Sequence, residues 1–177
     1  MKKRLTILLG FAIILGALIA CGESNNTGVA SSTSNNTSQT QSTPAAASHF
    51  KVGDVVKVGN TWQVTVNSVK TSQGDDFSTP GAGNIYVVID VTVKNISSQE
   101  QTISSLLNFT YKAADGTQGK ESILATGVSP APDGKVAAGD VVKGDLVYEV
   151  PAAQKTGTLA FQADITSGGE TVWDVKL

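Results

Sequence analysis

Asn84-Ile85-Tyr86-Val87-Val88-Ile89-Asp90-Val91-Thr92-Val93-Lys94-Asn95 is the stretch that decides the fold of this chain. Apolar side chains occupy every second position from 85 to 93, whereas Asp90, Thr92 and Lys94 stand between them. A period of two predicts a long β-strand with one face buried and the other in solvent. Tyr86 and Val88 interrupt the alternation, and we expect them to be half-covered on the outer face.

Shorter stretches of the same kind lie on both sides of this strand, separated by Gly, Asn, Asp and Pro. Asp115-Gly116 favours a tight hairpin turn. No amphipathic helix longer than one or two turns is visible. The pattern therefore predicts an all-β fold, an antiparallel β-sandwich of about eight strands. The strands are expected at 54–58, 62–67, 85–94, 109–111, 118–124, 146–150, 159–163 and 173–177.

Large side chains at inward positions of these strands form the expected core. An inter-sheet disulfide is excluded, because the only Cys of the chain, Cys21, precedes all of these strands. The two tryptophans could mark a ligand face, as aromatic residues do in carbohydrate-binding modules, but their inward positions favour the core. The predicted core residues are Trp62, Val64, Val87, Ile89, Val91, Leu146, Tyr148, Phe161 and Trp173.

The beginning of the chain has the pattern of a bacterial lipoprotein signal peptide. A basic start, Met1-Lys2-Lys3-Arg4, precedes an apolar run at 5–19 that is shorter than the roughly 20 residues of a permanent membrane helix. Leu18-Ile19-Ala20-Cys21 then matches the lipobox, in which lipid is joined to the Cys thiol. We expect removal of residues 1–20, lipidation of Cys21 and stable membrane anchoring on the extracellular side. The alternative is that the segment stays uncleaved as an anchor helix and that Cys21 is an ordinary small residue at its end.

Residues 21–48 predict a disordered tether. Between 22 and 48, 18 of the 27 residues are Ser, Thr, Asn or Gln, and none is aromatic. Such a segment buries too little apolar surface to offset the entropy lost on ordering. We expect a spacer that holds the folded domain, residues 49–177, away from the membrane. A glycosylated or adhesive stalk is the alternative.

Three stretches of the domain carry a family resemblance: VGDVVKVGNTWQVTVNSVK at 52–70, NIYVVIDVTVKNIS at 84–97 and GDLVYEVP at 144–151. Behind a lipobox and a polar tether, they resemble the family named domain of unknown function 4352. Those secreted or lipid-anchored bacterial proteins share the sandwich of a mycobacterial secreted antigen. The resemblance covers about residues 50–177 and implies an immunoglobulin-like fold. The family has no established activity, so it implies no catalytic residues.

Composition excludes several classes of function. Without Lys2, Lys3 and Arg4, ten of the 13 basic residues remain against 15 acidic ones. An acidic chain without Arg is not expected to bind nucleic acid, nor to dock on anionic lipid through its domain. One Cys and one His, His49 at the junction of tether and domain, supply neither a zinc site nor a Ser-His-Asp triad. No glycine-rich phosphate motif occurs, and we expect no cofactor.

Two classes of function remain. The first is a non-catalytic module that binds an envelope or extracellular protein or glycan through the two longest connections, 71–84 and 127–140; a purely structural spacer is not distinguished from it. The second is a small hydrolase that uses paired carboxylates in a cleft. Asp75 and Asp76 are candidate ligands of a weak calcium site, which would make the protein calcium-dependent. We expect no enzymatic activity, and the sequence does not identify the ligand.

Overall fold

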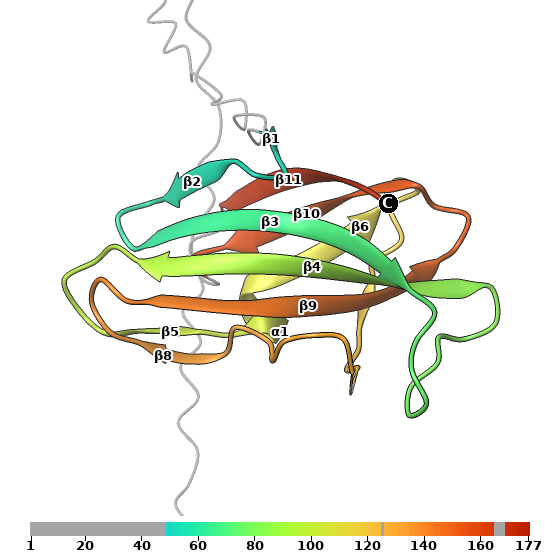
Figure 1. Ribbon diagram of the computed structural model, residues 1–177. Coiled ribbons are helices and arrows are strands. Elements are labelled where there is room, and N and C mark those ends of the chain that lie inside the picture. The colour runs from blue at the N-terminus through green and yellow to red at the C-terminus, as the bar shows by residue number, and fades with distance from the viewer. Residues whose placement is uncertain (1–48, 125, 165–168) are drawn as a thin grey trace, which may run out of the picture. The chain divides into compact units, whose positions relative to one another are not determined.

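Strands around the 84–95 stretch form two sheets that pack face to face (Figure 1). The computed structural model describes residues 49–124, 126–164 and 169–177. The sheets share one hydrophobic core. The five-stranded sheet has the order β2-β3-β4-β9-β7. Its strands are β2 (Val55–Val58), β3 (Trp62–Ser72), β4 (Asn84–Asn95), β9 (Val141–Pro151) and β7 (Lys120–Glu121).

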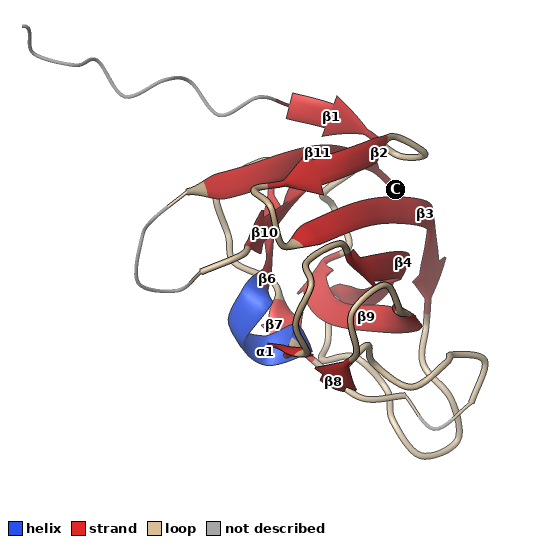
Figure 2. Ribbon diagram, turned by 90° about the vertical axis from the view of Figure 1, so that its left-hand side faces the viewer, coloured by secondary structure: helices blue, strands red, loops and turns tan. Residues whose placement is uncertain are grey.

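The four-stranded sheet has the order β1-β11-β10-β6. The first strand of the domain therefore lies beside the last one, and these two strands run parallel, with His49 paired to Val172. A small third sheet joins β5 to β8 (Figure 1). The one-turn helix α1, seen in Figure 2, precedes β6. The remaining elements are β1 (His49–Lys51), β11 (Glu170–Lys176), β10 (Thr156–Gln162), β6 (Phe109–Ala113), β5 (Gln101–Ile103), β8 (Gly134–Val136) and α1 (Ser105–Asn108).

The predicted β-sandwich and its core are confirmed. All nine predicted core side chains are buried, and none is more than 3% exposed. Both tryptophans belong to the core, and Trp173 packs against Phe50 with 6.0 Å between ring centroids. Aromatic rings of the two sheets also meet, since Tyr111 of β6 stacks on Tyr148 of β9. Side-chain packing therefore joins the two sheets, as expected for a domain without Cys.

The predicted hairpin turn at Asp115-Gly116 is confirmed, because the Ala113 N–H donates to the Thr117 carbonyl and the Gly119 N–H donates to the Tyr111 carbonyl. The predicted return at 118–124 is wrong only beyond Gly119. Gln118 makes a single bridge to Lys112, and the short strand β7 then pairs with β9 of the other sheet. The change of sheet occurs at Gly119, where an added Cβ would lie 3.0 Å from atoms of both Tyr111 and Tyr148. A side chain at position 119 would require these neighbours to move by a few tenths of an ångström, so the chain crosses between the sheets in close contact with the aromatic pair.

The number of strands also exceeds the predicted eight. Eleven strands form within the described residues, and β1, β5 and β8 are the ones without a counterpart in the sequence prediction. Each of these has three residues, too few to display an alternating pattern. His49, at the junction of tether and domain, is the first residue of β1, and its Nδ1 is 2.7 Å from Asp174 Oδ1.

The outer face of the five-stranded sheet is more covered than the sequence predicts. Tyr86 and Val88, expected to be half-covered, are only 3% and 1% exposed. The reason is that the segment after β7 folds back over the sheet, where Leu124 and Val128 pack on these two side chains and on Val147. A second, smaller apolar cluster thus lies outside the main core.

Glu149 of β9 connects this sheet to the turn before β4. Its Oε1 accepts hydrogen bonds from Asn84 Nδ2 at 2.7 Å and from the Gly81 backbone N–H at 2.8 Å. The Asn84 amide, followed by the Gly81 N–H, holds the pKa of the Glu149 carboxyl below its usual value. The stabilisation from this depressed pKa is present above the unfolded-state pKa of about 4.3 and is lost as pH falls through the folded value.

We therefore expect Glu149→Gln to destabilise the protein at about pH 7 and to lose most of that effect at about pH 3. Urea unfolding of the two proteins across this range measures the difference in the free energy of unfolding. Glu170→Gln, at an exposed position of β11, serves as the control and should show no such pH dependence. A difference between wild type and Glu149→Gln that stays constant with pH would contradict the assignment.

No helix among the described residues is long and apolar enough to cross a membrane. The predicted signal peptide at 1–20, the lipidated Cys21 and the tether at 21–48 lie outside the described residues.

Candidate functional site

The connection between β3 and β4 contains the candidate calcium ligands, and the structure gives Asp75 a structural role. Its Oδ1 accepts the backbone N–H groups of Phe77 and Ser78, at 2.9 and 2.8 Å. Its Oδ2 accepts the N–H of Thr126 at 3.0 Å, so this connection is tied to the segment after β7. Asp76 is exposed. The described residues hold no group of three or more His, Cys, Asp or Glu side chains arranged for a metal.

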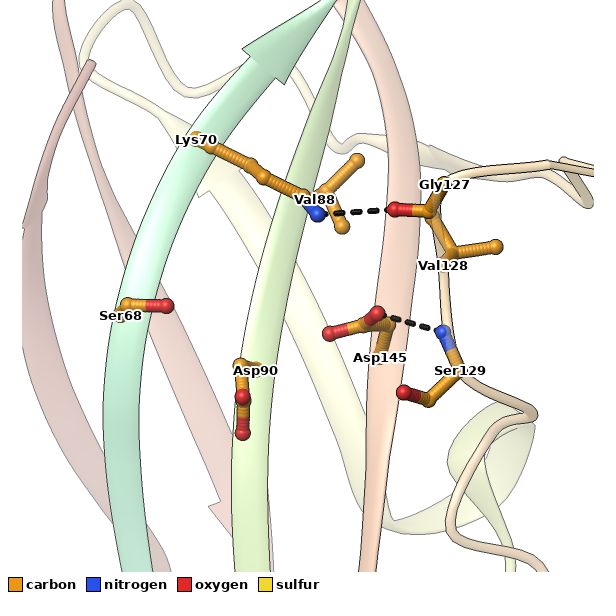
Figure 3. A pocket seen from close by; sticks show the side chains of 8 residues that line it. All are labelled: Ser68, Lys70, Val88, Asp90, Gly127, Val128, Ser129 and Asp145. Atoms are coloured by element: carbon orange, nitrogen blue, oxygen red, sulfur yellow. Dashed lines mark hydrogen bonds between the residues drawn. The ribbon is translucent and has the colours of Figure 1, made fainter.

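A groove lies instead on the outer face of the five-stranded sheet, over β4 and β9. One part, about 410 Å³, is shown in Figure 3, and a second part of about 360 Å³ shares Val128, Ser129 and Asp145 with it. We call the two parts together the outer-face groove. The first part is completed by Ser68, Lys70, Val88, Asp90 and Gly127. The second is completed by Ser105, Glu121, Ser122, Ile123, Leu124, Pro130, Ala131, Asp133 and Val147.

Two aspartates face each other across neighbouring strands in the first part. Asp90 of β4 is the register partner of Asp145 of β9, and residues so paired have Cβ atoms about 5 Å apart. Asp145 Oδ2 accepts the Ser129 N–H at 2.7 Å, and Lys70 Nζ donates to the Gly127 carbonyl at 2.8 Å (Figure 3). The segment 127–129 is thereby tied to both β9 and β3.

A β-bulge supplies the hydrogen-bond donor to Asp90. The pairing of β3 with β4 shifts register between Val66 and Ser68, which leaves Asn67 as an extra residue. Bulges of this kind turn a side chain out of the regular alternation. Asn67 Nδ2 accordingly donates to Asp90 Oδ1 and to Thr92 Oγ1, at 2.5 and 2.9 Å. The Asp90 carboxylate is therefore held in place by a neutral amide.

Two further carboxylates meet at a buried serine in the second part. Ser105 Oγ lies 2.9 Å from Glu121 Oε1 and 3.2 Å from Asp133 Oδ2, and the Ser105 N–H donates to Asp133. Ser105 is 4% exposed, so these hydrogen bonds are largely shielded from water. They link α1 to β7 and to the residue before β8. The Glu121 charge also acts on Tyr148, whose phenol pKa is raised mainly by burial and further by this carboxylate.

The outer-face groove is negatively charged. Asp90, Glu121, Asp133 and Asp145 line it against one lysine, Lys70. The ion pairs found within the described residues are His49–Asp174 and Lys135–Glu100, and neither involves a groove residue. The groove thus presents fixed hydrogen-bond acceptors and uncompensated negative charge to a ligand.

The sequence predicts part of this site. The connection at 127–140 contributes Gly127, Val128, Ser129 and Asp133, whereas 71–84 contributes no lining residue. Asp90 faces outward as expected. No local sequence pattern marks Glu121 and Asp145 as groove residues, because their neighbours in the groove come from strands distant in sequence. Only the pairing register of β4 with β9 and of β7 with β9 brings them together.

Solved structures of the same fold include those of three bacterial proteins. A candidate lipoprotein of Bacillus subtilis, ycdA, superposes with a TM-score of 0.58 at 14% identity over 72% of this chain, which spans 39% of that protein. The yjhA protein of Bacillus subtilis superposes with a TM-score of 0.56 at 22% identity, and the match covers 72% of this chain and 98% of that protein. The secreted protein MPT63 of Mycobacterium tuberculosis superposes with a TM-score of 0.54 at 17% identity, and the match covers 74% of this chain and 99% of that protein. At these identities the likeness shows the fold alone.

No curated protein sequence matches the chain. A family profile does: the one described as a domain of unknown function, DUF4352, matches residues 50–172, nearly the whole β domain. The resemblance predicted from the sequence is therefore confirmed, and the chain belongs to the DUF4352 family.

Proposed function

We propose that this protein is a lipid-anchored component of the bacterial cell envelope whose β-sandwich binds another envelope or extracellular component without catalysing a reaction. The anchoring part rests on the lipobox that ends in Cys21. The descriptions of two proteins of similar fold, as a candidate lipoprotein and as a secreted protein, agree with such a location.

The outer-face groove is the observation that supports the binding part. It is concave, it lies on the broad face of a rigid sheet, and neutral donors hold its carboxylates in fixed positions. A preorganised surface of this kind loses little conformational freedom when a ligand binds. Because Ser105 is 4% exposed and hydrogen-bonded to two carboxylates, binding explains the arrangement better than nucleophilic catalysis by this hydroxyl.

For the anchor, we expect Cys21→Ala to move the protein from the membrane fraction to the medium or the soluble fraction, because the thiol that would carry the lipid is gone. Cell fractionation with immunoblotting measures the distribution. Ser31→Ala, in the polar segment behind the lipobox, is the matched control and should remain in the membrane. Equal retention of Cys21→Ala and wild type would refute lipid anchoring.

For binding, a photo-crosslinking residue placed at Ile123 on the groove in intact cells should capture one dominant envelope component. Ile123 is 86% exposed, so a probe there reaches a ligand without disturbing the core. The control position is Val55, which is 63% exposed and does not line the groove. Identification of the product by mass spectrometry names the partner. The same products from both positions, or none from Ile123, would argue against binding through the groove.

A further inference from the structure

We infer that the outer-face groove takes a cationic peptide segment with aliphatic side chains, an inference that rests on the proposed binding function. Half of the residues that line the second part of the groove are apolar, and three of them, Leu124, Val128 and Val147, belong to the smaller apolar cluster outside the main core. Ile123 lies beside them and is 86% exposed. An exposed branched side chain next to an apolar hollow favours a ligand that brings apolar groups of its own.

Charge complementarity selects among the possible ligands. Glu121, Asp133 and Asp145 border the second part, and Asp90 continues the negative charge into the first part. The one lysine of the groove, Lys70, donates to a backbone carbonyl and pairs with none of these carboxylates. An anionic polymer would be repelled, whereas ammonium or guanidinium groups would form ion pairs with these carboxylates.

The lining also disfavours a neutral glycan. Among the described residues that line the two parts, none is Trp, Tyr or Phe. Sugar rings in protein sites commonly stack on such aromatic faces, and here the tryptophans are buried in the core instead. Aliphatic walls with carboxylates at the border match a peptide in which basic and aliphatic residues alternate, because each kind of side chain then meets its complement.

The test uses the full-length protein in detergent micelles and fluorescent peptides of defined sequence. The probe alternates Lys with Leu, and the comparison peptides alternate Glu with Leu or Lys with Ser. Fluorescence anisotropy should show binding of the Lys-Leu peptide, weaker binding of Lys-Ser and none of Glu-Leu. Binding should also weaken as salt is added, because surface charge is screened within about 10 Å at 0.1 M.

Two pairs of variants separate the groove from the rest of the surface. Glu121→Gln with Asp145→Asn should weaken binding of the Lys-Leu peptide about tenfold or more, whereas Glu170→Gln with Asp140→Asn changes the net charge equally and should leave it unchanged. Ile123→Ser should weaken binding as well. Its control, Leu106→Ser, alters a side chain that is 70% exposed and lines neither part.

Melting curves of all variants confirm that each is folded before its affinity is compared. Failure of the wild type to bind the Lys-Leu peptide, or equal binding by the groove variants and their controls, would overturn the cationic ligand. If crosslinking from Ile123 nevertheless captures a neutral or anionic partner, the groove remains a binding site and only the nature of its ligand is wrong.

Discussion

Gly144→Ala is expected to lower the free energy of unfolding by about 3 kcal/mol or more, at the upper end of the range for overpacked sites. The segment 130–132 passes across β9 at this point. A Cβ at position 144 would lie 2.2 Å from the Pro130 carbonyl oxygen and 2.7 Å from the Pro132 nitrogen. These are backbone atoms, so no side chain can rotate away, and the whole segment has to leave the strand.

Chemical denaturation of Gly144→Ala and wild type measures this loss. Gly169→Ala is the matched control, because nothing lies within 4 Å of its added Cβ. Displacing 130–132 also moves Ser129 away from Asp145, so we expect the variant to bind groove ligands poorly even where it is still folded. A Gly144→Ala protein as stable as the Gly169→Ala protein would show that 130–132 does not pack on β9.

Asn95→Ala is expected to destabilise the domain by about 3 kcal/mol, since unsatisfied buried groups cost about 1–3 kcal/mol each. Asn95 is fully buried at the end of β4. Its Nδ2 donates to the Gln99 and Val136 carbonyls, at 2.7 and 2.9 Å. Its Oδ1 accepts the N–H and the hydroxyl of Ser97. One side chain thus forms hydrogen bonds with polar groups of the β4–β5 turn and with a backbone carbonyl of β8.

Asn95→Asp sharpens the test of this network. It keeps the size of the side chain but places a carboxylate oxygen against the two carbonyls that Nδ2 now serves, so we expect it to be at least as destabilising as Asn95→Ala. Asn67→Ala, at an exposed position whose hydrogen bonds lie on the sheet surface, should cost less than about 1 kcal/mol. Equal stabilities of the Asn95→Ala and Asn67→Ala proteins would contradict the role given to Asn95.

Alternation along single strands was enough to predict the sandwich and its core. The pattern at 85–93 and the positions of Trp62, Phe161 and Trp173 depend only on which side of a strand faces inward. What covers the opposite side depends on chain segments far away in sequence. Tyr86 and Val88 are buried by Leu124 and Val128, and no periodicity at 84–95 indicates that this later segment folds back over them.

The same physical reason limits what the sequence says about the site. Loop length singled out 127–140, and part of this segment lines the outer-face groove, but the charged residues that line the groove with it come from β4, β7 and β9. Asp90 and Asp145 become neighbours only through the antiparallel register, and a shift by one residue would turn one of them inward. Asp75 shows the same limit, because a carboxylate in a polar loop suggests a cation, and the local sequence does not indicate the backbone N–H groups whose hydrogen bonds it accepts.

The pairing of β1 with β11 has a consequence for when the domain can fold. His49 and Val172 are about 120 positions apart, and β11 lies between β1 and β10 inside the four-stranded sheet. Contacts between such distant segments form late and slowly, because a long loop has to close first. A chain synthesised from its N-terminus therefore lacks the central strand β11 until almost all of it has been made. Strand order alone thus delays completion of the four-stranded sheet until synthesis is nearly finished.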